Sequence, residues 1–90
     1  MSEARAKHLI LVGKPGCHLC DDAREVVSAV VEELALDAAA PAVSVEERSI
    51  LDDEALFAKY AEEIPVVLID GRVHNYWRID PVRLKTALLA

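Results

Sequence analysis

The sequence predicts an α/β domain with the element order β-α-β-α-β-β-α, in which a four-stranded mixed sheet is flanked by three helices. Two continuous apolar runs, at residues 8–12 and 66–69, are typical of buried strands. Apolar residues recur at helical spacing between residues 19 and 36. Asp70 and Gly71 predict a tight hairpin that returns antiparallel to the second apolar run.

The first half of the chain predicts two parallel strands joined by a helix. The run 8–12 ends at Gly13, and an amphipathic helix is expected over about residues 19–36. Its apolar stripe consists of Ala23, Val27, Val30 and Leu34. Pro41 prevents continuation of the helix, and the alternating residues 43–46 predict a short second strand.

The second half predicts a helix, a hairpin and a last helix. An aspartate at position 52 or 53 is expected to cap the helix that carries Leu56, Phe57 and Tyr60. Residues 66–69 and 72–76 are expected to pair as the hairpin, which adds an antiparallel pair to the sheet. The dipeptide Asp80-Pro81 predicts the N-cap and first residue of a helix whose core face carries Leu84 and Leu88.

Length, composition and charge restrict the class of protein. Residues 1–90 suffice for one domain, of which 1–7 are expected to be flexible, and an apolar share of 53% can form one core. The net charge of -6 argues against nucleic acid or an anionic membrane as the main partner. No apolar run approaches the ~20 residues of a membrane span, and the charged N-terminus does not read as a signal peptide. We therefore expect a cytoplasmic monomer.

The two cysteines, Cys17 and Cys20, lie where the first strand ends and the first helix begins. A helix N-terminus stabilises a thiolate through free N–H groups and the positive end of the helix dipole. Such a site can lower a thiol pKa from ~8.5 to about 3.5–7.5. We expect Cys17 to be the nucleophile and Cys20, one turn into the helix and less exposed, to be the resolving thiol.

Charged neighbours of the cysteines act in opposite directions. Lys14 can place an ammonium near the Cys17 thiolate, whereas Asp21 and Asp22 would raise its pKa if close. The residues alone do not fix the sign of the net effect. A tetrahedral zinc site needs four ligands, and the chain has no second cysteine pair, so we expect no metal.

Two further groups of charges have ordinary interpretations. The acidic stretch that includes Glu46, Glu47, Asp52, Glu62 and Glu63 is expected to form a solvated face. Arg24 could steer anions from the first turns of its helix or pair with a nearby acid.

The dipeptide Ile64-Pro65 opens the second apolar run, and two interpretations stay open from the residues. A cis bond would turn the Ile64 backbone outward, so that its N–H and C=O could pair with an extended substrate. Alternatively, Pro65 is an ordinary trans proline at the start of a strand.

The segment Lys14-Pro-Gly-Cys-His-Leu-Cys20, the Ile64-Pro65 dipeptide and the Asp70-Gly71 hairpin together resemble the glutaredoxins of the thioredoxin superfamily. The chain is most similar to short bacterial glutaredoxin-like proteins with a C-H-L-C centre, over roughly residues 9–89. The resemblance implies a thioredoxin-like fold with a cis Pro65 beside the cysteines. It also implies no bound cofactor, with glutathione as a co-substrate.

The chain departs from the glutaredoxin pattern at two places. The dipeptide between the cysteines is His18-Leu19 instead of Pro-Tyr, and residues 74–80 replace a Gly-Gly pair. Asp80 could stand in for the aspartate that helps glutaredoxins hold glutathione. The bulk of Tyr76 and Trp77 should hinder close backbone contact with glutathione. These two aromatic residues could line the site or pack beneath the last helix, and we expect one of them to pack.

The sequence thus predicts a thiol–disulfide oxidoreductase that reduces protein or glutathione mixed disulfides through Cys17 and Cys20. The expected substrate-binding residues are Lys14, Ile64, Pro65 and Asp80. Two alternatives are a non-catalytic binding module of the same fold and a metal-binding or redox-sensing protein.

Overall fold

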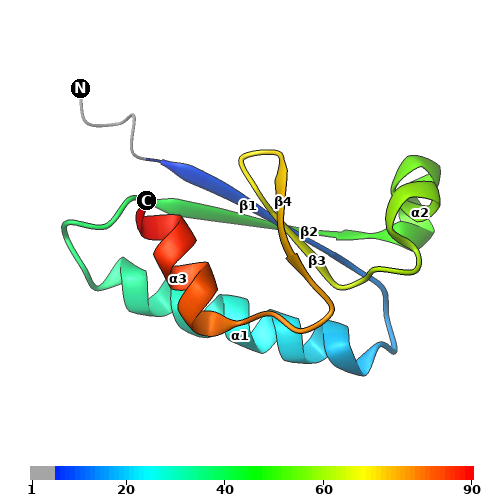
Figure 1. Ribbon diagram of the computed structural model, residues 1–90, viewed down its shortest axis with the longest axis horizontal. Coiled ribbons are helices and arrows are strands. Elements are labelled where there is room, and N and C mark those ends of the chain that lie inside the picture. The colour runs from blue at the N-terminus through cyan, green and yellow to red at the C-terminus, as the bar shows by residue number, and fades with distance from the viewer. Residues whose placement is uncertain (1–5) are drawn as a thin grey trace.

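The computed structural model describes residues 6–90 and has the expected element order (Figure 1). The elements are β1 (Lys7–Gly13), α1 (His18–Ala35), β2 (Val43–Ser49), a 3₁₀ turn η2 (Ile50–Asp52), α2 (Glu54–Tyr60), β3 (Val66–Ile69), β4 (Arg72–Tyr76) and α3 (Pro81–Leu89). Of the segment 1–7 that we expected to be flexible, residues 1–5 lie outside the described part. Lys7 already belongs to β1, so the expectation is wrong for this residue.

The four strands form one mixed sheet in the order β2-β1-β3-β4, which confirms the predicted fold class. β1 runs parallel to β2 and antiparallel to β3, and β3 pairs antiparallel with β4. Helices α1 and α3 cover one face of the sheet, whereas α2 lies at the opposite side, near the end where β1 leads into α1 (Figure 1). The C-terminal end of β1, where the cysteines follow, is therefore enclosed from two sides.

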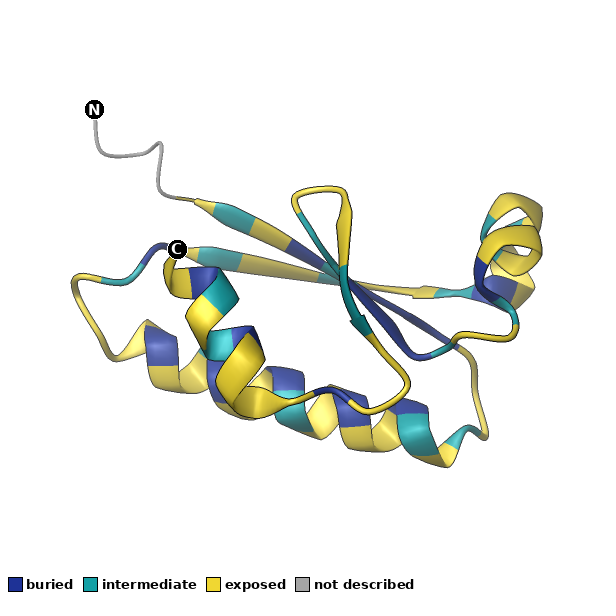
Figure 2. Ribbon diagram, viewed as in Figure 1, coloured by how far each residue is buried: buried dark blue, intermediate teal, exposed yellow. Residues whose placement is uncertain are grey.

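The face under α1 and α3 holds the main core (Figure 2). The predicted stripe of α1 is buried there, and so are Leu84 and Leu88 of α3 against Leu9 and Leu11 of β1. Burial of each such leucine stabilises the fold by about 1.5–3 kcal/mol. The outer side of α1 is charged, and no helix in residues 6–90 is both long and apolar enough to cross a membrane.

The opposite face has a smaller core, because α2 has only seven residues. Val12, Ile50, Tyr60 and Val66 are buried in it. The rest of this face carries polar side chains of β1 and β2: His8, Ser44, Glu46 and Arg48. Glu46 accepts hydrogen bonds from Arg48 Nε at 2.6 Å and pairs with His8 Nε2 at 3.1 Å.

Local signals fix the helix starts and the hairpin. Asp53 caps α2 and Asp80 caps α3, each by accepting two backbone N–H bonds, as the sequence predicts. Asp70 (φ 51°) and Gly71 (φ 86°) adopt the left-handed conformation that a two-residue hairpin turn requires. Strand β2 runs on to Ser49, beyond the short strand expected, because it pairs with β1 in register over seven residues.

Candidate active site

The two cysteines form a disulfide at the start of α1. Cys17 is the N-cap residue, its Cα lies 5.2 Å from that of Cys20, and its Sγ accepts the Cys20 backbone N–H at 3.1 Å. Cys17 is half-buried, whereas the side chain of Cys20 is only 1% exposed. The predicted asymmetry in exposure is confirmed, because Cys17 is the more accessible of the two cysteines.

Pro65 lies at the start of the inner strand β3, at the end of the sheet where β1 leads into the cysteines. Val12 near the end of β1 pairs with Val66, and Pro65 directly precedes that residue. The Ile64–Pro65 peptide bond is cis and Pro65 is fully buried. Neither the N–H nor the C=O of Ile64 has a hydrogen-bond partner among residues 6–90. The cis interpretation is therefore confirmed, while the substrate-binding role of Ile64 and Pro65 stays a prediction.

Both aromatic residues at the end of β4 are exposed, so the expectation that one of them packs beneath α3 is wrong. Tyr76 is 44% exposed and Trp77 is 51% exposed. Trp77 has a left-handed backbone (φ 64°), which directs its side chain away from the core that α3 covers. Its N–H donates to Pro65 O at 2.8 Å and its indole Nε1 donates to Glu62 O at 3.2 Å. Trp77 is thus a fixed surface residue.

An apolar depression lies on the β4 side of the disulfide. It is lined by Leu19, Tyr76, Trp77 and Arg78. Leu19 is one of the two residues between the cysteines, and the rings of Tyr76 and Trp77 meet edge to face with their centroids 5.0 Å apart. An adjoining pocket of about 300 Å³ lies between Trp77 and the first turns of α1. Its lining combines apolar residues with the charged Asp22 and Arg78.

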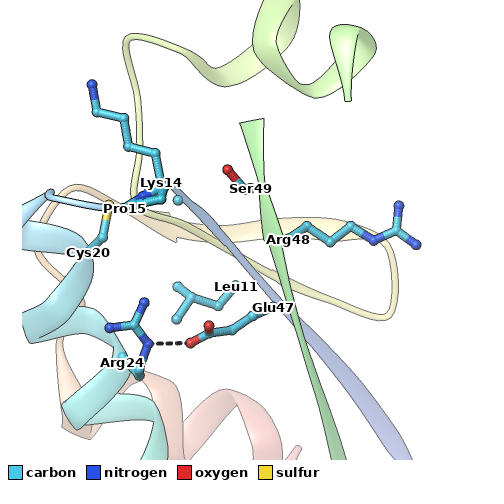
Figure 3. A pocket seen from close by; sticks show the side chains of 9 residues that line it. Leu11, Lys14, Pro15, Cys20, Arg24, Glu47, Arg48 and Ser49 are labelled. Carbon is cyan, nitrogen blue, oxygen red and sulfur yellow. Dashed lines mark hydrogen bonds and ion pairs between the residues drawn. The ribbon is translucent and has the colours of Figure 1, made fainter. Parts of the chain in front are cut away.

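A second pocket lies on the β2 side of the disulfide and has a different character. Its volume is about 250 Å³, and its lining includes Cys20, Leu11, Arg24 and Glu47. Figure 3 shows Arg24 reaching from α1 toward Glu47 on β2. Arg24 Nε contacts Glu47 Oε2 at 2.5 Å and its Nη1 contacts Asp21 Oδ1 at 2.9 Å. The hydrogen bonds to Glu47 and then to Asp21 raise the pKa of Arg24, and the interpretation of Arg24 as an ion-pair partner is confirmed.

The structure separates the two charged residues expected to bind substrate. Lys14 is exposed and lines the pocket on the β2 side. Asp80 lies beyond Trp77, where its Oδ1 accepts the N–H groups of Val82 at 2.9 Å and Arg83 at 3.2 Å. The role of each in substrate binding stays a prediction.

Metal binding finds no support in the geometry of the described residues. Within 6–90, no group of three or more histidine, cysteine or acidic side chains is arranged to hold a metal ion. His8 pairs with Ser44 and Glu46 on the open face of the sheet, and His74 lies on β4.

Comparison with known proteins identifies the family. The sequence profile of the Glutaredoxin-like domain (DUF836) matches residues 8–89. The chain belongs to this family. It is 32% identical over 75 residues to the uncharacterized protein Rv0508 of Mycobacterium tuberculosis, covering 83% of this chain and 75% of that one. It is also 33% identical over 73 residues to the "Glutaredoxin-like protein YDR286C homolog" of Dictyostelium discoideum, covering 79% of this chain and 65% of that one.

Solved structures confirm the thioredoxin-like fold of this glutaredoxin-like chain. The structural-genomics target XcR50 from X. campestris is 32% identical, with a TM-score of 0.68 over 89% of this chain and 93% of that one. Mitochondrial thioredoxin 3 from Saccharomyces cerevisiae, in its oxidized form, has a TM-score of 0.63 at 13% identity, over 91% of this chain and 76% of that one. A thioredoxin-like fold with a disulfide at the start of α1 supports a redox role.

Sequence reasoning missed one residue of the site. Glu47 is exposed, as expected of a solvated face, but it also lines the pocket that contains Cys20. The available signal was the alternation of the strand: Glu47 follows Val43 and Val45 at a spacing of two, so it shares their face of the sheet.

Proposed function

We propose that this protein is a thiol–disulfide oxidoreductase that reduces protein disulfides in preference to glutathione mixed disulfides. The observation that carries the proposal is the Cys17–Cys20 disulfide at the N-terminus of α1, with Cys17 accessible and Cys20 buried. The family and the fold support a redox role of this kind. We place the activity in the cytoplasm, where the reducing environment would keep the pair available as a dithiol.

The reaction follows from the positions of the two sulfurs. In the reduced protein, the Cys17 thiolate attacks one sulfur of the substrate disulfide, and the other sulfur leaves as a thiolate. The Cys20 thiolate then attacks Cys17 Sγ, which releases the second substrate sulfur and forms the Cys17–Cys20 disulfide. Two electrons pass from the dithiol to the substrate. The Cys20 N–H that contacts Cys17 Sγ at 3.1 Å, together with the helix dipole, would stabilise the attacking thiolate.

The surface beside Cys17 favours a polypeptide substrate. The exposed Trp77 and Tyr76 occupy the segment where glutaredoxins carry a Gly-Gly pair, and they add apolar area that glutathione does not match. The free N–H and C=O of Ile64 can pair with the backbone of an extended chain. A fixed tryptophan is a typical anchor for a protein partner, because it buries a large area at little cost in conformational entropy.

A thiol titration with elemental analysis of freshly purified protein separates the candidate functions. Two free thiols that oxidise reversibly, without stoichiometric metal, are expected for the oxidoreductase. Stoichiometric zinc or iron would favour the metal-binding alternative, and inert thiols without metal would favour the non-catalytic binding module.

The preference for protein substrates has its own test. The glutathione mixed disulfide of the Cys20→Ser variant is titrated against a glutathione redox buffer, beside a glutaredoxin that has the Gly-Gly pair. We expect the mixed disulfide to form less readily here, since Trp77 and Tyr76 restrict backbone contact with the tripeptide. Equal or greater stability of the mixed disulfide in this protein would contradict the preference.

A further inference from the structure

The resolving step needs a base for a thiol that bulk water scarcely reaches. Once Cys17 is bonded to a substrate sulfur, Cys20 carries a proton, and only the thiolate attacks a disulfide. The Cys20 side chain is 1% exposed, and its Sγ lies so close to Gly13 that a Cβ on this glycine would be 3.0 Å away. The proton must therefore leave through the pocket that the side chain lines.

That pocket lies on the β2 side and contains a carboxylate. Its volume of about 250 Å³ is ample for water molecules. Glu47 stands opposite Leu11 in the parallel pairing of β1 and β2, and its β2 neighbours on the same face are Val43 and Val45. Val45 and Glu47 of this row are exposed, and Glu47 lines the same pocket as Cys20.

Arg24 links the carboxylate to the thiol. It follows Cys20 by four residues, so the two side chains share one side of α1. Its guanidinium contacts Glu47 and Asp21 at the same time (Figure 3). When Glu47 takes up a proton, the charge of Arg24 is less neutralised and becomes available to a thiolate one turn away. A proton that moves from Cys20 to Glu47 would thus leave a thiolate beside a cation.

We propose that Glu47 accepts the proton of the Cys20 thiol, through water in this pocket, when Cys20 resolves the mixed disulfide. The assignment rests on the proposed oxidoreductase function. The Cys20 S–H bond breaks and the proton passes to the Glu47 carboxylate. The sulfur electron pair forms the bond to Cys17 Sγ, and the substrate sulfur leaves as a thiolate. Glu47 then returns the proton to the solvent at the pocket mouth, since its side chain is 48% exposed.

Other charged groups around the pocket do not take this role. Asp21 of α1 is not among the residues that line the pocket. Figure 3 shows that Lys14, from the loop after β1, and Arg48 of β2 direct their charged ends away from Glu47. Arg48 is hydrogen-bonded to Glu46 on the opposite face of the sheet. Glu47 is therefore the carboxylate of this pocket that is placed to serve Cys20.

The two attacks can be timed separately with an aromatic disulfide that releases a coloured thiolate. Stopped-flow mixing with the reduced protein gives one equivalent when Cys17 attacks and a second when Cys20 resolves the mixed disulfide. In Glu47→Gln we expect an unchanged first phase and a second phase slowed by roughly tenfold or more at neutral pH. The difference should shrink as the pH rises, because an unassisted thiol ionises more readily in alkaline solution.

Two matched variants complete the test. Glu46→Gln changes the adjacent residue on the opposite face and should leave both phases unchanged, whereas Glu47→Asp retains a carboxylate and should restore part of the second phase. A second phase of Glu47→Gln that equals or exceeds the wild-type rate would overturn the assignment. A faster phase is expected if Glu47 only neutralises Arg24. A missing first phase in the wild-type protein would overturn the proposed function, and the proton transfer with it.

Discussion

The two sides of the Cys17–Cys20 disulfide are built from different chemistry. On the β4 side, exposed Tyr76 and Trp77 form an apolar surface with Leu19, the residue before Cys20. On the β2 side, Arg24 and Glu47 form a charged pair in the pocket that Cys20 lines. An apolar surface thus lies on one side of the disulfide, and on the other side the buried Cys20 lines a pocket with charged side chains.

This difference matches the needs of the two sulfurs. In the proposed reaction, a disulfide substrate must be held while Cys17 attacks it, and apolar area beside the disulfide would supply binding energy. Cys20 meets no external molecule in the proposed reaction, but its proton must be transferred. One short helix start can serve both requirements, because Cys17 is the half-buried N-cap of α1 whereas Cys20, one turn further on, is buried.

The largest expected effect comes from replacing the cysteines one at a time, which distinguishes their two roles. Cys17→Ser should abolish the reduction of disulfides, since it removes the attacking thiolate. Cys20→Ser should still react once and then accumulate a mixed disulfide at Cys17, which mass spectrometry detects. Turnover retained in Cys17→Ser, with a dead Cys20→Ser, would mean that the two roles are reversed.

Removal of the Trp77 side chain should weaken the binding of a protein substrate to the apolar side of the disulfide. Trp77→Ala is expected to lower kcat/KM for a disulfide-bonded protein by roughly thirtyfold, the loss typical of a buried tryptophan anchor of about 2 kcal/mol. Reduction of a small aromatic disulfide should change much less. Phe57→Ala is the matched control, because Phe57 on α2 is similarly exposed (52%) and lines none of the pockets beside the cysteines. Equal losses in Trp77→Ala and Phe57→Ala would contradict a docking role for this surface.

A side chain at Gly13 should crowd Cys20 and so affect both the stability of the fold and the step that Cys20 performs. A Cβ at Gly13 would lie 3.0 Å from Cys20 Sγ and 3.2 Å from its Cβ. Gly13→Ala should therefore lower the free energy of unfolding by about 1 kcal/mol, the lower end for overpacking of a core, and slow the second phase of the reaction more than the first. Unchanged unfolding in denaturant would show that the Cys20 side chain shifts without cost.

The smallest expected effect is a pH dependence of the stability of the fold, which arises at His74 on β4 and involves neither side of the disulfide. His74 Nε2 is buried without a hydrogen-bond partner among residues 6–90, and burial, followed by the charge of Arg83, lowers the pKa of His74. The unfolded chain then takes up the proton first as pH falls, so stability should decline as pH drops below about 6.5. Thermal unfolding of His74→Gln should show a weaker decline over the same range. An equal decline in both proteins would assign the effect to other groups.

The local sequence was enough for the order of elements and the start of each helix. Asp53 and Asp80 cap their helices through their own side chains, and Asp70-Gly71 makes its turn with two residues. The placement of Cys17 at a helix N-terminus likewise needs only the strand before it and the amphipathic stretch after it. Each of these features depends on residues within a few positions of one another, so a pattern in the sequence predicts it.

The sheet pairing and the backbone after β4 were decided only by the tertiary structure. The register between β1 and β2 places Glu47 opposite Leu11, under α1, while its neighbour Glu46 faces the other side. Trp77 has a left-handed backbone, its N–H donates to Pro65 O and its indole Nε1 donates to Glu62 O. With these contacts its side chain is exposed, although a tryptophan is usually expected to be buried. Both outcomes depend on contacts between residues far apart in the chain. By itself, therefore, the sequence determined that a cysteine pair lies at the start of a helix, and the packing of the sheet determined what surrounds each sulfur.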